Sequence, residues 1–264
     1  MAAEIPRNGF RLEGKVAVVT AGTLGIGLAI AERLATEGAH VVISSRKTES
    51  CNNALKQLSA KGLRNVCAIP CHVGSAEDRK RLVDYTLERF GRIDILVNNA
   101  GINPTYGDLL DMEEKTWDKL FEVNVKVGFL LAKMVIPHME KQGGGSIIFN
   151  ASVGAYLINE KTAAYSITKT AVVALVHALA SACGKKNIRV NGIAPGVIKT
   201  KMSSIIWQDE DGKPKESAIS AGNDLGRLGI PEECAGAVAF LASNDASYIT
   251  GETIIIAGGV KARL

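Results

Sequence analysis

The sequence has few aromatic residues and no long run of charges of one sign. Aromatic residues make up 5% of the chain, and its net charge of +4 is spread without five like charges in a row. It therefore lacks the charged tracts typical of nucleic-acid-binding and membrane-surface proteins. No stretch reaches the ~18 consecutive apolar residues of a membrane span, and the first residues, Met-Ala-Ala-Glu-Ile-Pro-Arg, lack the apolar segment of a secretory signal. We expect neither a nucleic-acid partner nor a membrane span.

Cysteine is also scarce, with five residues and no Cys-x-x-Cys pair. This pattern predicts free thiols in a reducing compartment rather than a disulfide framework. Cys67 and Cys71 could face the same way on an extended segment, but no cluster of other metal-binding residues accompanies them. We therefore expect no metal site. The other three cysteines are Cys51, Cys183 and Cys234.

Apolar residues and glycine, in contrast, are abundant: 47% of the 264 residues are hydrophobic, and 27 are glycine. Short apolar runs alternate with helical patterns from one end of the chain to the other. The expected strands are Lys15–Thr20, His40–Ser44, Asn65–Ile69, Ile93–Val97, Ser146–Phe149, Ile188–Ile193 and Thr253–Ala257; the expected helices are Leu28–Gly38, 48–61, 76–90, 114–140, 162–184 and 231–243. This alternation indicates a parallel sheet covered on both faces. We expect one doubly wound α/β domain over residues 1–264.

A glycine-rich turn joins the first expected strand to the first expected helix. Glycines let a phosphate approach the backbone, and a helix N-terminus offers free N–H groups and the positive end of its dipole. A dinucleotide-binding fingerprint needs this strand–turn–helix context, although a tight turn without a ligand is the alternative. The predicted contacts are Ala21, Gly22, Thr23, Leu24, Gly25, Ile26 and Gly27.

A second candidate ligand segment, Asn98-Asn99-Ala100-Gly101, follows the fourth expected strand. The carboxyl ends of the strands are where open α/β sheets bind ligands. We therefore expect Asn98, Ala100 and Gly101 to contact the same dinucleotide.

Tyr165 and Lys169 lie four residues apart, on one face of an expected helix. An ammonium beside a phenol favours the phenolate, so Lys169 is expected to stand beside the Tyr165 hydroxyl and lower its pKa toward the working pH. A general acid or base works best when poised there. Ser152, thirteen residues upstream, could give a substrate oxygen a second donor. The alternatives are a surface tyrosine beside a lysine, and a serine that caps the turn after its strand.

Together these motifs resemble the short-chain dehydrogenase/reductase family over nearly the whole chain. The matching residues are the glycine loop, Asn98-Asn99-Ala100-Gly101, Asn124, Ser152, Tyr165-x-x-x-Lys169 and Pro195-Gly196. The family usually writes Thr-Gly where this chain has Thr20-Ala21, with Gly22 displaced by one position. The resemblance implies a Rossmann domain with a helical substrate lid, a nicotinamide cofactor and a carbonyl substrate.

The resemblance also implies roles for the matching residues. Ser152 and Tyr165 hydrogen-bond the carbonyl oxygen, Tyr165 donates the proton, and Lys169 lowers the Tyr165 pKa and holds the nicotinamide ribose. Asn124 holds a water that reconnects Lys169 to solvent; the alternative for Asn124 is a buried amide that bonds backbone. The residues expected to meet the nicotinamide are Pro195, Val197, Ile198 and Thr200.

The end of the second expected strand favours NADP over NAD. NAD-specific sites place an acidic residue there to hold the ribose, whereas NADP sites use an arginine for the 2′-phosphate. This chain has Ser45-Arg46-Lys47 and no carboxylate at that point. Arg46 can pair with a phosphate through two parallel hydrogen bonds. His72 and Val73 are expected to border the adenine, although the family commonly has Asp at the position of His72.

Within the family, Val-Ile-Ser-Ser-Arg-Lys, Pro-Cys-His-Val-Gly and the final Arg-Leu are similar to the peroxisomal NADPH-dependent carbonyl and retinal reductases. That similarity implies a homotetramer that reduces ketones, aldehydes, α-dicarbonyls and quinones. The alternatives are a 3-oxoacyl-thioester reductase, a steroid or retinol dehydrogenase, and, more remotely, a nucleotide-binding sensor without catalysis. Lys199, Lys201, Lys213 and Lys215 leave the thioester reading open.

Residues 201–224 are expected to form the substrate lid. The apolar side chains predicted to line the pocket are Leu157 and Ile158 on one wall and Met202, Ile205, Ile206 and Trp207 on the other; the alternative is a helix pair whose apolar side simply packs.

Two further expectations concern partners and place. Residues 163–183 are apolar almost all round, so we expect the sheet to cover one side of this helix and a second subunit the other, with His177 in the interface. Ala262-Arg263-Leu264 follows the small–basic–leucine order read by the peroxisomal import receptor. We therefore expect a peroxisomal protein, with a cytoplasmic one as the alternative.

Overall fold

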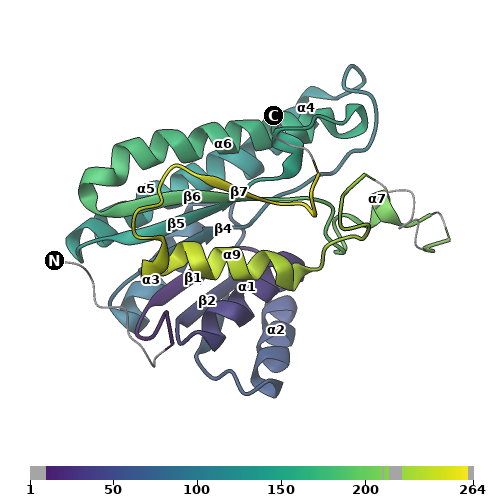
Figure 1. Ribbon diagram of the computed structural model, residues 1–264. Coiled ribbons are helices and arrows are strands. Elements are labelled where there is room, and N and C mark those ends of the chain that lie inside the picture. The colour runs from purple at the N-terminus through teal and green to yellow at the C-terminus, as the bar shows by residue number, and fades with distance from the viewer. Residues whose placement is uncertain (1–9, 210, 214–221, 261–264) are drawn as a thin grey trace.

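A seven-stranded parallel sheet forms the centre of the molecule, with strand order β3-β2-β1-β4-β5-β6-β7 (Figure 1). The computed structural model describes residues 10–209, 211–213 and 222–260. The strands are β1 (Val16–Val19), β2 (His40–Ser45), β3 (Val66–Pro70), β4 (Ile95–Asn98), β5 (Gly145–Asn150), β6 (Ile188–Pro195) and β7 (Thr253–Ile256). All seven expected strands are confirmed to within two residues at either end.

Helices cover both faces of the sheet. They are α1 (Gly25–Thr36), α2 (Thr48–Ala60), α3 (Ala76–Phe90), α4 (Glu114–Phe121), α5 (Val127–Lys141), α6 (Ala163–Cys183), α7 (Ser204–Trp207) and α9 (Pro231–Ala242). Side chains of α1, α2 and α9 build the core on one face, and those of α3, α5 and α6 build it on the other. In Figure 1, α5 and α6 lie above the sheet and α1 and α9 below it. Every residue of β1 and β4 is buried because both faces are covered.

The expected helix 114–140 is not one α-helix. A π-helical segment, η1 (Glu122–Lys126), separates α4 from α5, and Asn124 lies at its centre. The Asn124 amide bonds both backbone groups of Ile102 and the hydroxyl of Thr168. These contacts with other segments offset the poorer helical geometry, and such bulges are often found at functional sites.

The expectation that α6 is covered on both sides holds for only one side of the single chain. Ten of its residues are buried, and five of these, from Val172 to Cys183, belong to the hydrophobic core on this face of the sheet. By length and composition alone the stretch Glu160–Lys186 could cross a membrane, and one side of it packs against the core of the sheet. Its other side is exposed and carries mostly small residues: Thr170, Ala174, His177, Ala178, Ser181 and Ala182.

The five cysteines are free, as the sequence predicted. Among the described residues no group of three or more His, Cys, Asp or Glu side chains could hold a metal ion. Lys215, part of the expected lid and Ala262-Arg263-Leu264 lie outside the described residues.

Candidate active site

Four neighbouring strands, β1, β4, β5 and β6, bring the predicted site residues to one edge of the sheet. Because the strands are parallel, the segments that follow their carboxyl ends meet there. These segments carry the glycine loop, the Asn98–Gly101 run, Ser152 and the stretch from Pro195 to Thr200. A Cβ atom on Gly25 would lie 3.2 Å from Thr200 Cγ2, so the segment after β6 reaches across to the glycine loop. The structure therefore assembles the predicted elements into one site.

The start of α1 is suited to a phosphate. Its N-cap residue, Leu24, makes no side-chain capping hydrogen bond, and its first turn contains no acidic residue. The N–H groups of this turn are thus not capped by a side chain within the described structure, and no carboxylate of the turn opposes an anion. A Cβ atom on Gly27 would overlap the Ala21 carbonyl oxygen and the Asn99 side-chain nitrogen, so only glycine lets the helix sit this close to the loop. The glycine loop therefore fits the pyrophosphate of a dinucleotide.

Ala21 stands where the family usually has glycine, and it adopts the left-handed backbone conformation with φ of 50°. This conformation is uncommon for a residue with a Cβ atom. The Gly22 N–H donates to the Ser44 carbonyl at 3.0 Å and ties the turn to β2. The loop therefore places alanine in a backbone conformation that glycine adopts more readily.

Ser152 and Tyr165 are hydrogen-bonded to each other. Ser152 also begins the short helix η2 (Val153–Ala155), where its Oγ accepts from the Gly154 N–H at 3.1 Å. Ser152 therefore caps the turn after its strand, as its alternative role predicted, and also contacts Tyr165. Burial raises the pKa of Tyr165 to about 12, and the Ser152 hydrogen bond lowers it only in part. At neutral pH Tyr165 is therefore protonated.

Lys169 is placed differently from the sequence expectation. Its Nζ lies over the Tyr165 ring, 5.4 Å from the ring centre, and donates to the Asn150 carbonyl oxygen at 2.7 Å. Its residue is 4% exposed, and this burial lowers the pKa of Lys169 to about 8. The Tyr165 pKa is therefore raised and not lowered as expected, because burial is its largest cause and the ammonium bonds a backbone oxygen while it lies over the ring.

Asn124 shows the backbone-bonding arrangement that was its alternative. Its Oδ1 accepts from the Ile102 N–H at 2.8 Å, and its Nδ2 donates to the Ile102 carbonyl and to Thr168 Oγ1, each at 3.0 Å. It is nevertheless close to Lys169, since a Cβ atom on Gly101 would lie 3.4 Å from Lys169 Nζ and 3.5 Å from Asn124 Oδ1. The water-holding role of Asn124 stays a prediction.

The end of β2 has the charge expected of a phosphate site. Arg46 and Lys47 follow the strand and are exposed, and the nearest acidic residue along the chain, Glu49, lies in the first turn of α2. Two contacts hold the loop after β3: the His72 N–H donates to Asp78 at 2.7 Å, and Arg79 donates to the Val73 carbonyl at 2.7 Å. The adenine contacts of His72 and Val73 stay predictions.

The predicted substrate residues are apolar side chains left open on the surface. Leu157, Ile158, Met202 and Ile205 are 44%, 63%, 53% and 61% exposed. Trp207 is partly buried, and its Nε1 donates to Ser203 Oγ at 3.1 Å. The segment containing α7 projects from the body of the molecule in Figure 1. The exposed apolar groups are those that an apolar substrate or a closed lid would cover.

Of two further residues of the site, Asn99 was named from the sequence only as part of the Asn98–Gly101 run, and Asn150 was not named. Asn99 and Asn150 are hydrogen-bonded to each other, and Asn150 also holds Lys169. The signal that could have found Asn150 is position alone, since it is the last residue of β5.

Comparison with known proteins decides the family. A family model described as enoyl-(acyl carrier protein) reductase matches residues 20–261. A "Dehydrogenase/reductase SDR family member 4" from Caenorhabditis elegans is 58% identical over 98% of this chain and 100% of its own length. The chain belongs to the short-chain dehydrogenase/reductase family. Proteins of the same name from Oryctolagus cuniculus and Homo sapiens are 52% and 49% identical over 96% of this chain, covering 96% and 90% of their own lengths.

A solved structure with a closely similar fold supports the assignment to the short-chain dehydrogenase/reductase family. A protein described as a short-chain alcohol dehydrogenase from Sinorhizobium meliloti superposes with a TM-score of 0.89 at 32% identity, over 97% of this chain and 100% of that one. The protein is therefore an oxidoreductase that uses a nicotinamide cofactor. The residues at the sheet edge fit this cofactor, because the start of α1 suits its pyrophosphate and the end of β2 its adenosine half.

Proposed function

We propose that the protein is an NADPH-dependent reductase of carbonyl compounds, with Tyr165 as the proton donor. The observation that carries this proposal is the hydrogen-bonded pair of Ser152 and Tyr165 beside buried Lys169, at the same sheet edge as the glycine loop. The relatives' printed names contain both dehydrogenase and reductase, which supports hydride transfer in either direction. A sensor without catalysis has no need of this trio, and the chain keeps all three residues.

The residues divide the reaction among them. Bound NADPH would supply the hydride for the carbonyl carbon. Ser152 and Tyr165 would both donate to the carbonyl oxygen as negative charge grows on it, and donors fixed in advance are a large catalytic contribution. Protonated Tyr165 would pass its proton to that oxygen. Lys169, as an ammonium at neutral pH, would favour the phenolate left behind.

We propose bulky apolar carbonyl compounds as the substrate class: ketones, aldehydes, α-dicarbonyls, quinones and polyene aldehydes such as retinal. The exposed apolar side chains Leu157, Ile158, Met202 and Ile205 support it.

The second candidate is a 3-oxoacyl-thioester reductase, favoured by the printed description of the matching family model and by Lys201 and Lys213 near the lid. NADPH oxidation across dicarbonyls, quinones, retinal, a steroid ketone and acetoacetyl-CoA tests both. A kcat/KM highest for acetoacetyl-CoA would contradict the carbonyl-reductase proposal.

Replacing Arg46 with alanine is expected to weaken NADPH binding and spare NADH. A guanidinium that pairs with the 2′-phosphate makes charge-assisted hydrogen bonds, whose loss should raise the NADPH Kd about tenfold to a hundredfold. The Kd for NADH should change less than about threefold, since NADH has no phosphate there. Fluorescence titration of both cofactors gives the measurement. Arg64→Ala, another exposed arginine, is the control; equal losses for NADH and NADPH in Arg46→Ala would contradict NADP preference.

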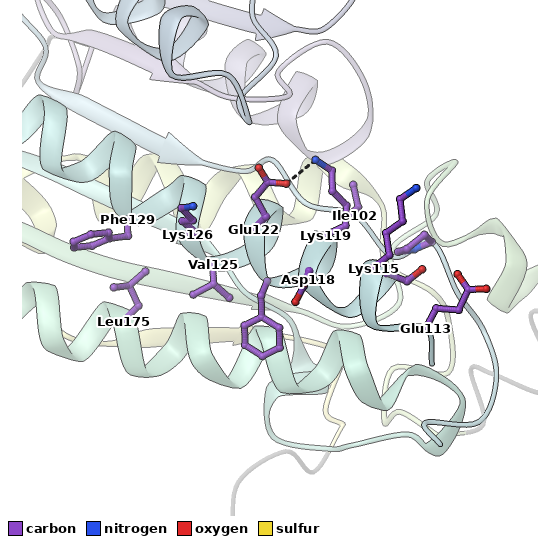
Figure 2. A pocket seen from close by; sticks show the side chains of 13 residues that line it. Ile102, Glu113, Lys115, Asp118, Lys119, Glu122, Val125, Lys126, Phe129 and Leu175 are labelled. Atoms are coloured by element: carbon purple, nitrogen blue, oxygen red, sulfur yellow. Dashed lines mark hydrogen bonds and ion pairs between the residues drawn. The ribbon is translucent and has the colours of Figure 1, made fainter. Parts of the chain in front are cut away.

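We also propose that the protein is a homo-oligomer, most simply a tetramer, in which α6 packs against a second copy. A groove of about 1190 Å³ runs along α4, η1 and α5, and Leu175 of α6 is one of the residues that line it. Figure 2 shows its apolar residues Val125, Phe129 and Leu175 and the ion pair of Lys119 with Glu122. Because the groove carries both signs of charge, the same surface on a second copy can complement it, as a two-fold interface requires.

Light scattering at micromolar concentration tests the assembly. The wild-type chain should give the mass of four chains, whereas Phe129→Glu, which places a charge in the groove, should lower the mass. Phe129 is 40% exposed in the single chain, so this change should leave the fold intact. A wild-type monomer would contradict the proposal.

A further inference from the structure

Asn150, the last residue of β5, uses its backbone and its side chain for two different tasks. Its backbone carbonyl accepts the 2.7 Å hydrogen bond from Lys169 Nζ. Its side-chain Nδ2 donates to Asn99 Oδ1 at 2.9 Å. The residue that holds the buried lysine is therefore itself held by a residue on the neighbouring strand end.

Asn99 in turn holds the start of the glycine loop. Its Nδ2 donates to the carbonyl oxygens of Thr20 and Ala21, at 3.0 and 3.1 Å, and its backbone N–H donates to Thr20 Oγ1 at 3.0 Å. Gly27 packs so closely on this amide that a Cβ atom there would overlap it. Since the Asn99 nitrogen is committed to the loop, its oxygen is the atom presented to Asn150.

These contacts connect the glycine loop to Lys169 through Asn99 and Asn150. The Asn99 side-chain amide bonds both the Ala21 carbonyl and the Asn150 side chain, and the backbone carbonyl of Asn150 accepts from the Lys169 ammonium. One end is the loop expected to hold the pyrophosphate, and the other is the cation beside Tyr165. We propose that Asn150 is a positioning residue that couples the glycine loop to Lys169. The catalytic part of this inference rests on the reductase function proposed above.

A substitution of the Asn150 side chain can remove its hydrogen bond with Asn99 without removing many other polar contacts. Its Oδ1 is buried and has no hydrogen-bond partner among the described residues, and neither amide atom of Asn98 has one. The side chains of Asn98 and Asn150 line the same small enclosed cavity between β4, β5 and α5. Among the described residues, the hydrogen bond to Asn99 Oδ1 is therefore the contact that fixes the Asn150 side chain. Substituting the side chain removes that link and leaves the backbone carbonyl available to Lys169.

The test compares Asn150→Leu and the smaller Asn150→Ala with a matched control, Asn65→Leu. Asn65 also donates to two backbone carbonyls, of Ala35 and Ala39, but it lies before β3 at the opposite edge of the sheet. Three quantities are measured on each full-length protein: the NADPH Kd by fluorescence, kcat and KM for the best carbonyl, and the pH of half-maximal rate for oxidation of the corresponding alcohol.

Loss of the link should raise the NADPH Kd about threefold to tenfold, the range for one hydrogen bond. The alcohol-oxidation profile should move to higher pH, because a less firmly held Lys169 favours the Tyr165 phenolate less. Asn65→Leu should change neither. Asn99→Leu combined with Asn150→Leu should weaken NADPH binding no more than Asn99→Leu alone, since both remove one link.

The measurements distinguish failure of the Asn150 positioning role from failure of the proposed carbonyl reduction. If both Asn150 variants match Asn65→Leu in NADPH Kd and in pH profile, the positioning role is overturned, and full additivity with Asn99→Leu would overturn it as well. If the wild-type protein reduces no carbonyl but the Asn150 variants still lose NADPH affinity, the coupling to the loop is supported and the proposed reaction is the part that fails.

Discussion

Tyr165→Phe should lower kcat for carbonyl reduction by about a thousandfold, within the range for loss of a positioned general acid. The phenylalanine ring keeps the packing of Tyr165 and the face over which Lys169 lies, but it has neither the proton to donate nor the hydrogen bond with Ser152. The NADPH Kd should stay within about twofold, because the phosphate contacts expected of the glycine loop are untouched. Stopped-flow or steady-state NADPH oxidation gives the rate, and fluorescence titration gives the Kd.

Tyr248→Phe provides the control for this variant, because Tyr248 is fully exposed and lies outside the site. It should retain wild-type kcat and KM. Turnover by Tyr165→Phe at the wild-type rate would remove Tyr165 as the proton donor. A large rise in NADPH Kd without a change in kcat would show instead that the residue serves binding.

Lys169→Met should abolish most activity and, at pH 7, make the protein more stable. Burial lowers the pKa of Lys169 to about 8 from its ordinary value of 10.5, so the folded state holds the charged form at a cost. That cost is fully present below about pH 8 and falls as the pH rises toward 10.5, because over this window the unfolded chain binds more protons than the folded one. Removing the charge should stabilise the fold by roughly 1–2 kcal/mol at pH 7, less than the full shift implies because the Asn150 carbonyl loses its donor.

Urea unfolding at pH 7 and at pH 10 measures this difference. The stability gap between Lys169→Met and the wild type should be smaller at pH 10 than at pH 7. Lys126→Met, at an exposed lysine of η1, should show little gap at either pH. A Lys169→Met protein less stable than the wild type at pH 7 would show that the ammonium contributes more through its hydrogen bond than it costs by burial.

The sequence was sufficient for the sheet and for the grouping of the motifs. β1 and β4 are short apolar runs because both faces of the sheet are covered, and such runs are visible in the sequence. The order of those strands then brings the motifs to one edge, which the family resemblance implied.

Features that depend on contacts between distant segments were not predictable in the same way. The π-helical segment around Asn124 rests on bonds to Ile102 and Thr168, which lie 22 and 44 residues away. Lys169 faces the Asn150 carbonyl because β5 ends beside α6, and helical spacing from Tyr165 carries no information about that carbonyl. Asn150 itself carries no motif, so only the fold shows what it touches.

The hydrogen bonds between the glycine loop and Lys169 also differ in the number of residues that separate their two partners along the chain. Lys169 and Asn150 are 19 residues apart, Asn150 and Asn99 are 51 apart, and Asn99 and Ala21 are 78 apart. Longer separations cost more entropy to close and tend to form later in folding. We therefore expect the half of the site around Tyr165 and Lys169 to form before the glycine loop joins it. NADPH would then bind only chains in which the glycine loop has joined the rest of the site, and so would stabilise that folded form over chains in which it has not.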